Sequence, residues 1–216
     1  MLKEYKTVIG TACCEIEEKK SKFIASVKPV STEEEALEFI NGLKSKYWDA
    51  THNVYAYYIV GETVIQRFSD DGEPSGTAGM PVLEMIKRME VQNLVVVVTR
   101  YFGGTLLGAA GLIRTYAKSA QAGIQAAGIV KKILCREIAI TTEYTLFGKI
   151  QNFLGSRKFN IKDIIYKEDV QILVYVPVDM TDNFAGEIIQ LTNAKAVVEP
   201  GEKLYITVDE EGKVLS

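Results

Sequence analysis

The feature that most constrains the fold of this chain is a short, uninterrupted apolar run at residues 94–98, which reads LVVVV. Such a run is typical of a strand that is buried on both of its faces. The ends of a buried strand are natural positions for functional sites in α/β folds. The polar, glycine-containing segments on either side of this run therefore carry most of the functional argument.

The first of these segments is an acidic loop at residues 69–79. It holds glycines at positions 72, 76 and 79, which permit backbone turns that other residues resist. Pro81 then suits the first turn of a helix predicted over residues 81–89. The polar residues of the loop that could serve a site are Asp70, Asp71, Glu73 and Ser75.

The second segment, residues 100–108, contains the pair Gly103 and Gly104 and leads into a helix predicted over residues 109–127. A glycine-rich turn before a helix offers free backbone N–H groups and a positive dipole end to an anion. Arg114 and Lys118 share the polar face of this helix by their spacing, and Arg114 could add charge to the anion site. The predicted apolar stripe of the helix consists of Ile113, Ala117, Ala120 and Ile124. We expect both loops to meet in one site.

A purely structural interpretation fits the same residues. Arg100 and Arg114 would pair with Asp70, Asp71 or Glu73 and fasten one loop to the other without any ligand, as ion-pair networks often do. The glycines follow neither the Walker pattern nor the dinucleotide fingerprint. His52 is the only histidine, and a single histidine is more often a hydrogen-bonded structural residue than a catalyst or a ligand.

The two segments together resemble a known signature. RFSDDGEPSGTAGMP, followed by VVVVTRYFGGTLLGAAGLIRTY, is similar to the motifs of the YigZ/Impact family, and the resemblance extends over essentially the whole chain. It implies an α+β fold. Residues 1–132 would form an N-terminal α/β domain of the ribosomal-protein-domain type that is also seen in elongation factor G. Residues 133–216 would form a ferredoxin-like domain. The family also places a characteristic histidine, here His52, near the signature loops.

Element order supports two domains independently of the resemblance. A charged stretch at residues 31–35, with Ser31 and Glu34 as a candidate capping box, opens a predicted helix that runs to residue 46. After Gly128, which can end the long helix, the pattern is strand, helix, strand, strand, helix, strand. That βαββαβ order is the ferredoxin-like plan. We therefore expect a boundary near residues 130–137.

Composition limits the functions that are open to the chain. A net charge of −3 over 216 residues lacks the strongly basic character of a dedicated nucleic-acid binder, so any RNA binding must be local. Three cysteines, Cys13, Cys14 and Cys135, include no CxxC spacing, which argues against a disulfide framework and a zinc site. There is neither a signal-peptide pattern nor an apolar run that could span a membrane, so we expect a cytoplasmic protein without a membrane partner.

Three functions compete. The first is a translation-linked regulatory protein that binds RNA or the ribosome, with phosphates on Arg100, Arg114 and Lys118 and bases stacked on Tyr101 or Phe102. The second is a metal-dependent hydrolase or phosphoryl-processing enzyme that uses the acidic loop, with His52 as acid or base. The third is a regulator that acts through protein contacts, with a translation-regulatory protein as partner. The eukaryotic relatives of the family regulate translation through such a partner, but they bind it with a different N-terminal segment, so the resemblance does not transfer that role whole.

We favour the first, non-enzymatic function and expect no cofactor and no resident metal. The predicted ligand- or RNA-binding residues are His52, Arg67, Asp70, Asp71, Glu73, Ser75, Arg100, Tyr101, Phe102, Gly103, Gly104, Arg114 and Lys118.

Overall fold

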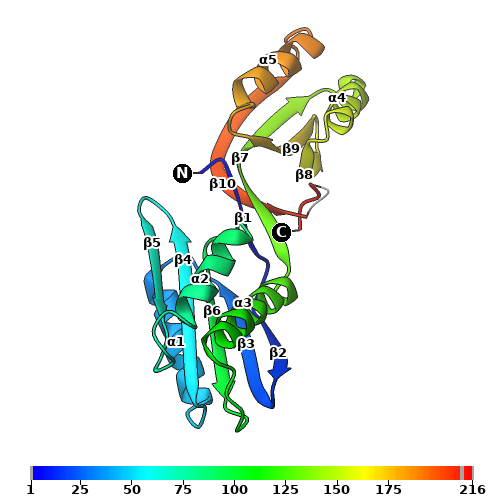
Figure 1. The fold of residues 1–216 in the computed structure, drawn as a ribbon. Helices are drawn as coiled ribbons and strands as arrows, with labels where there is room; N and C mark the ends of the chain where they lie inside the picture. Colours follow the sequence, from blue (N-terminus) through cyan, green and yellow to red (C-terminus); the bar gives the residue numbers. More distant parts are fainter. Residues whose placement is uncertain (1, 210–211, 216) are drawn as a thin grey trace. The chain divides into compact units, whose positions relative to one another are not determined.

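The computed structural model describes residues 2–209 and 212–215, which divide into two compact units (Figure 1). The first unit is Tyr5–Val130, and the second comprises Leu2–Glu4 together with the chain from Lys131 onward. The α+β fold class predicted from the sequence is confirmed. In the part of the chain that the structure describes, no helix is long and apolar enough to cross a membrane.

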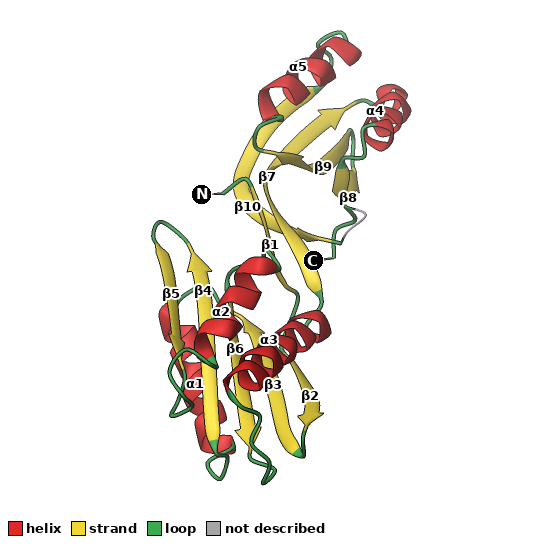
Figure 2. Cartoon of the chain, in the orientation of Figure 1, coloured by secondary structure: helices red, strands yellow, loops and turns green. Residues whose placement is uncertain are grey.

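The first unit is built on a five-stranded sheet with the order β2-β3-β6-β4-β5, in which all neighbouring strands are antiparallel. Its elements, preceded by β1 (Glu4–Val8), are β2 (Ala12–Glu18), β3 (Ser21–Pro29), α1 (Glu33–Lys46), β4 (His52–Val60), β5 (Val64–Ser69), α2 (Gly79–Arg88), β6 (Leu94–Tyr101) and α3 (Ala109–Ala126). Helices α2 and α3 cover one face of this sheet, and α1 covers the other (Figure 2).

The central strand β6 explains why the unit has this layered form. Leu94, Val96 and Val98 belong to the core beneath α2 and α3, whereas Val95 and Val97 pack with the buried residues of α1. Side chains alternate between the faces of a strand, so an unbroken apolar run supplies both cores at once. The prediction of a strand buried on both faces is confirmed.

Helix α1 begins one residue later than its predicted capping box. Thr32, not Ser31, is the N-cap, and its hydroxyl accepts the backbone N–H of Glu35. The carboxylate of Glu35, not Glu34, reaches back to the N–H of Ser31 at 2.6 Å. The capping-box assignment was therefore wrong by one residue, because Ser31 and Thr32 both have a glutamate three residues later and either could start the helix.

The second unit has the βαββαβ order that was predicted. Its elements are β7 (Ile129–Thr142), α4 (Tyr144–Ser156), β8 (Asn160–Tyr166), β9 (Val170–Pro177), α5 (Thr181–Leu191) and β10 (Val197–Val208). β7 pairs with β10 and β9, and β9 pairs with β8, always antiparallel. The core of this unit includes Ile150 and Leu154 of α4 with Phe184 and Ile188 of α5, packed against the sheet.

We predict that the second unit folds on its own, because it has a core that is separate from those of the first unit. A fragment of residues 131–216 is expected to show one cooperative unfolding transition in urea, followed by circular dichroism. Residues 2–4 should add stability to it, since the carbonyl of Lys3 accepts the N–H of Leu134. A gradual, non-cooperative loss of signal from both the fragment and a version with residues 2–4 attached would contradict this prediction.

Candidate functional site

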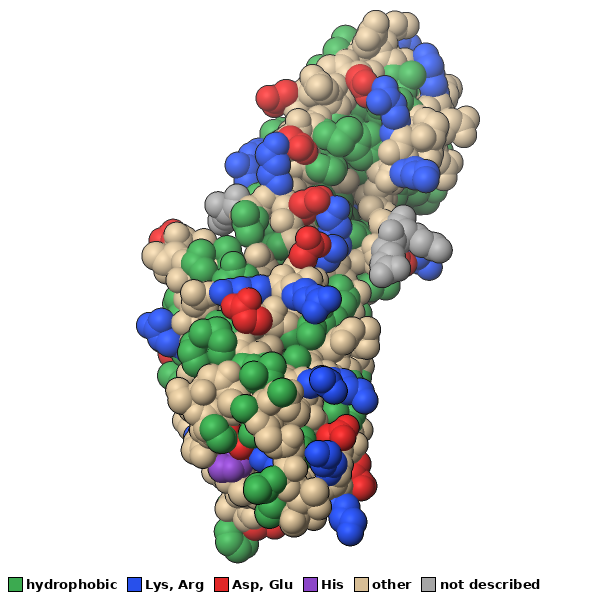
Figure 3. Space-filling view, viewed as in Figure 1, with side chains coloured by type: hydrophobic (Ala, Val, Ile, Leu, Met, Phe, Trp, Pro, Cys, Tyr) green, Lys and Arg blue, Asp and Glu red, His purple; other side chains and the backbone are tan. Residues whose placement is uncertain are grey.

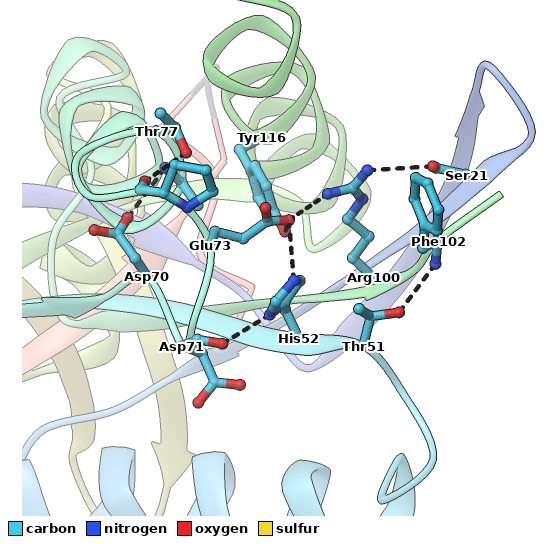
Figure 4. Close-up of polar contacts among 12 residues, drawn as sticks. Ser21, Thr51, His52, Asp70, Asp71, Glu73, Thr77, Arg100, Phe102 and Tyr116 are labelled. Atoms are coloured by element: carbon cyan, nitrogen blue, oxygen red, sulfur yellow. Dashed lines mark hydrogen bonds and ion pairs between the residues drawn. The ribbon is translucent and has the colours of Figure 1, made fainter. Parts of the chain in front are cut away.

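The two signature loops come together at one end of the first unit's sheet, where β4 begins and β6 ends. They enclose a cavity of about 380 Å³ between the acidic loop and the start of α3. Its polar lining includes His52, Glu73 and Arg100, which lie close together (Figure 4). Its apolar lining includes Pro74, Phe102, Leu106, Leu107 and Leu112. We call this cavity the signature-loop pocket.

The centre of the polar group is the carboxylate of Glu73, whose residue is only 8% exposed. Its Oε1 accepts a hydrogen bond from Arg100 Nη1 at 2.6 Å and another from the hydroxyl of Tyr116 at 2.7 Å. His52 Nε2 lies 3.8 Å from the same oxygen. Residues from β4, the acidic loop, β6 and α3 therefore converge on a single oxygen atom.

Arg100 and Tyr116 are themselves enclosed. Arg100 is 5% exposed, and its guanidinium lies near the rings of Phe23 and Phe102, at 5.3 and 5.6 Å from their centroids. The pKa of Tyr116 is strongly raised, mainly by burial and secondly by the hydrogen bond to Glu73. Its hydroxyl therefore stays protonated and acts as a donor. The ion pair thus compensates the charge of each partner within a site where an unpaired charge would be costly.

The orientation of His52 follows from its backbone contact. Nδ1 lies 2.8 Å from the carbonyl oxygen of Asp71. A carbonyl can only accept, so Nδ1 carries the proton, and Nε2 is an acceptor when the ring is neutral. The distance of 3.8 Å from Nε2 to Glu73 is longer than a hydrogen bond. Nε2 is therefore available to a ligand.

The other two carboxylates of the acidic loop have separate structural partners. Asp70 accepts the backbone N–H groups of Gly76, Ala78 and Gly79, so it closes the loop and caps the start of α2, where Ala78 offers no side-chain cap. Asp71 accepts the N–H of Asn53 and pairs with Lys44, each at 2.7 Å. Among the described residues, no cluster of three or more His, Cys, Asp or Glu side chains is placed to hold a metal.

The second loop is held by the hairpin between β2 and β3. Ser21 Oγ accepts the N–H of Gly103 at 3.1 Å and lies 3.4 Å from Arg100 Nη2. A Cβ atom on Gly103 would lie 2.0 Å from the backbone of Lys20, so only glycine fits this approach. The hairpin turn itself has left-handed backbone at Lys19 and Lys20, with φ of 46° and 64°. These two exposed lysines therefore lie next to the second loop.

Several predicted site residues lie away from the pocket lining. Arg67 has a side chain that is 63% exposed and approaches Glu33 of α1. Tyr101 donates to Asp49, and this hydrogen bond raises its pKa. It follows Arg100 in β6 and so points to the opposite face of the sheet. Ser75 is exposed, and Gly104 lies in the loop with a φ of 79°.

The cations of α3 are exposed rather than fastened to the acidic loop. Arg114 and Lys118 form no ion pair with any residue in the described ranges, whereas Arg100 pairs with Glu73. The structural interpretation of the arginines therefore holds for Arg100 and fails for Arg114. In the space-filling view, the histidine atoms lie at the surface of the first unit, near apolar and basic side chains (Figure 3).

Sequence reasoning missed Tyr116 and Leu112, because the predicted stripe of α3 was displaced. Ala120 and Ile124 are buried as expected, but Ile113 is exposed and Leu112 and Tyr116 take the inner positions. Thr51, which accepts the N–H of Phe102, was missed as well, and Ser21, which accepts the N–H of Gly103, was not assigned to the site. The sequence did contain one signal for the apolar lining of the pocket. Leu106 and Leu107 are adjacent leucines within a glycine-containing loop, and such a pair indicates an apolar contact.

Comparison with known proteins identifies the family. Residues 19–124 match the model of the Impact N-terminal domain, and residues 140–195 match a domain of unknown function, DUF1949. IMPACT family member YvyE of Bacillus subtilis is 45% identical over 206 residues, which are 95% of each chain. The chain belongs to the IMPACT family. The resemblance read from the signature motifs is confirmed.

Other relatives agree with this assignment. IMPACT family member YigZ of Escherichia coli is 30% identical over 79% of this chain and 84% of that protein. Human Protein IMPACT is 38% identical over 98 residues, 43% of this chain and 30% of that protein. A solved structure described as a hypothetical protein matches 92% of this chain and 97% of its own with a TM-score of 0.60 at 26% identity.

Proposed function

We propose that this IMPACT family protein is a translation-linked regulatory protein that binds RNA or the ribosome through the rim of the signature-loop pocket. The observation that carries the proposal is the character of the rim. Phe102 is 46% exposed and Leu106 is 81% exposed at the mouth of a pocket whose charges are internally paired. Exposed aromatic and apolar side chains beside cations are the means by which proteins hold single-stranded nucleic acid.

Four exposed cations on the two elements that adjoin this rim, the β2–β3 hairpin and α3, would contact phosphates. Lys19 and Lys20 lie at the hairpin turn that touches Gly103, and Arg114 and Lys118 lie on α3, whose first residue lines the pocket. We do not include Arg100 among the phosphate contacts, because its guanidinium is buried against Glu73. It would shape the floor of the pocket instead of contacting a phosphate. A role in translation also implies a cytoplasmic location.

The enzyme alternative has less support. A hydrolase that uses the acidic loop would need its carboxylates to converge on one metal ion. Instead, Asp70 binds backbone N–H groups, Asp71 binds Lys44, and Glu73 binds Arg100. A regulator that acts only through a protein partner remains the other candidate, and it would give no RNA binding in the experiment that follows.

The test compares two matched pairs of charge removals. Arg114→Ala/Lys118→Ala removes two rim cations, and Lys87→Ala/Arg88→Ala removes two exposed cations at the far end of α2. The rim pair is expected to weaken binding of fluorescent single-stranded RNA and to flatten the slope of log K against log salt by about 1.4, since each phosphate contact contributes about 0.7. The control pair should leave both unchanged.

Binding to purified ribosomes should fall in parallel for the rim pair. Equal binding by the unmodified protein, the rim pair and the control pair at every salt concentration would refute the proposed site. Absence of binding to both RNA and ribosomes by the unmodified protein would refute the proposed function.

A further inference from the structure

We propose that the signature-loop pocket takes an unstacked nucleobase that carries an exocyclic amino group, and that it discriminates against uracil. The inference rests on the proposed function, since it names the part of an RNA that the pocket recognises. Glu73 Oε2 and His52 Nε2 would accept the amino N–H groups, and Phe102 would stack on the ring. The argument begins from Glu73.

The two carboxylate oxygens of Glu73 differ in their hydrogen bonding. Oε1 accepts from Arg100 and Tyr116, whereas no described residue donates a hydrogen bond to Oε2. Oε2 is also absent from the fully enclosed polar atoms without a partner, which in the described chain are Gln92 Nε2, Arg100 Nε and Thr142 Oγ1. Because Glu73 lines the pocket and is more than nine-tenths buried, the remaining surface of Oε2 faces the cavity. A carboxylate oxygen requires a donor.

A second acceptor lies beside the first. The Nδ1 proton of His52 is donated to the carbonyl of Asp71, so a neutral ring presents an acceptor at Nε2, 3.8 Å from Oε1 of the same Glu73 carboxylate. An amino group has two N–H donors on one nitrogen and can serve two neighbouring acceptors. The O4 carbonyl of uracil would instead bring a third acceptor to the same place, and buried acceptors left without donors are costly.

Charge favours a neutral ligand over an ion. The positive charge of Arg100 and the negative charge of Glu73 compensate each other at 2.6 Å, so the floor has no net charge when His52 is neutral. A phosphate placed there would face Oε2, and an ammonium group would face the guanidinium of Arg100. Each would lose hydration without gaining an unpaired countercharge. The amino edge of a base supplies donors without a net charge.

The walls fit the rest of a base. Leu106, Leu107 and Leu112 provide apolar surface, and the Phe102 ring can offer one face for stacking. A cavity of about 380 Å³ also lies within the usual range for small-molecule sites. An aromatic ring with apolar faces and one polar edge therefore matches both the walls and the floor, while the cations outside the pocket would hold the adjoining phosphates.

The experiment compares single-stranded RNA octamers of equal charge by fluorescence anisotropy at one salt concentration. Oligocytidine is expected to bind about tenfold more tightly than oligouridine, because a base edge with two good hydrogen bonds discriminates to about this extent. Octamers of adenosine and of purine riboside, which differ by one amino group per nucleotide, should differ in the same direction. This comparison needs no protein variant, so it does not depend on the folding of a mutant.

Two variants test which residues of the pocket cause the preference for cytidine over uridine. Phe102→Ala should weaken binding of cytidine and uridine octamers alike, because stacking does not distinguish them. Glu73→Gln, verified as folded by circular dichroism, should lower the preference for cytidine several-fold, because the amide can turn a donor toward the base.

The outcomes separate this inference from the proposed function. Salt-dependent binding of both pyrimidine octamers with equal affinity, or a preference for uridine, would overturn the inference and leave RNA binding in place. Equal affinity for the adenosine and purine riboside octamers would also overturn the inference alone. A folded Glu73→Gln protein that keeps the full preference for cytidine over uridine would overturn it as well. No binding of any octamer at low salt, and none of ribosomes, would overturn both.

Discussion

Replacing Arg100 with alanine is expected to lower the free energy of unfolding of the first unit by about 3–5 kcal/mol, because it leaves the buried Glu73 carboxylate without its countercharge. The side chains of this pair are 6% and 3% exposed, so water cannot solvate the charge that remains. Urea unfolding followed by tryptophan fluorescence and circular dichroism would measure the loss. Arg67→Ala, which removes an arginine with an exposed side chain from β5, should change stability by less than about 0.5 kcal/mol.

A combined replacement tests the cause. Arg100→Met/Glu73→Leu/Tyr116→Phe removes both charges and the hydroxyl that donates to Glu73, and it fills similar volume, so it should cost less than Arg100→Ala alone. A loss below about 1 kcal/mol for Arg100→Ala would mean that the ion pair is not the main constraint on the loops. The expected instability also means that reduced RNA binding by an Arg100 variant cannot be read as a lost phosphate contact, and the exposed Arg114 and Lys118 are the better probes.

Substituting alanine at Gly103 is expected to cost about 1–3 kcal/mol, the usual range for forcing atoms into a packed site. The new Cβ would lie 2.0 Å from both the carbonyl carbon and oxygen of Lys20, and backbone atoms cannot rotate away. The second loop and the hairpin must then separate, which would break the 3.1 Å contact between the Gly103 N–H and Ser21 Oγ. RNA binding should weaken with stability, since Phe102 is the preceding residue.

Gly42 is the matched control for this substitution. It lies within α1, and a Cβ atom added there would meet no neighbouring atom within 4 Å. Gly42→Ala should therefore stabilise the protein by about 0.5–1 kcal/mol through helix propensity. If Gly103→Ala were as stable as the unmodified protein, the close approach between the loop and the hairpin would not exist in solution.

The sequence predicted well those parts of the fold that produce a local periodic pattern. The apolar run in β6 required two covered faces, and the βαββαβ order of the second unit followed from strand and helix patterns alone. The first half of the predicted α3 stripe was wrong, because Leu112 and Tyr116 lead to Ala120 and Ile124 at helical spacing just as Ile113 and Ala117 do. Packing distinguishes the two: a Cβ on Gly123 would lie 2.9 Å from Ala25 of β3, and Tyr116, two turns earlier on the same face of α3, is buried with it.

The partners within the site could not be predicted in the same way. Glu73 and Arg100 are far apart in sequence, and the choice of Glu73 over Asp70 or Asp71 depends on how the acidic loop closes. Asp70 accepts three backbone N–H groups, and Asp71 forms an ion pair with Lys44 of α1. The three carboxylates carry the same charge, so charge does not distinguish their roles, and the path of the backbone sets which partner each one reaches.

The position of Arg100 on β6 has a further consequence for the way the pocket opens. β6 is hydrogen-bonded along its length to β3 and β4, so its amide hydrogens are expected to be among the slowest of the first unit to exchange with solvent. Residues 102–108 belong to a loop that can open locally. Arg100 is therefore expected to keep its place when the loop opens. A ligand would enter as residues 102–108 move aside, and it would then meet an ion pair whose arginine is fixed by the sheet.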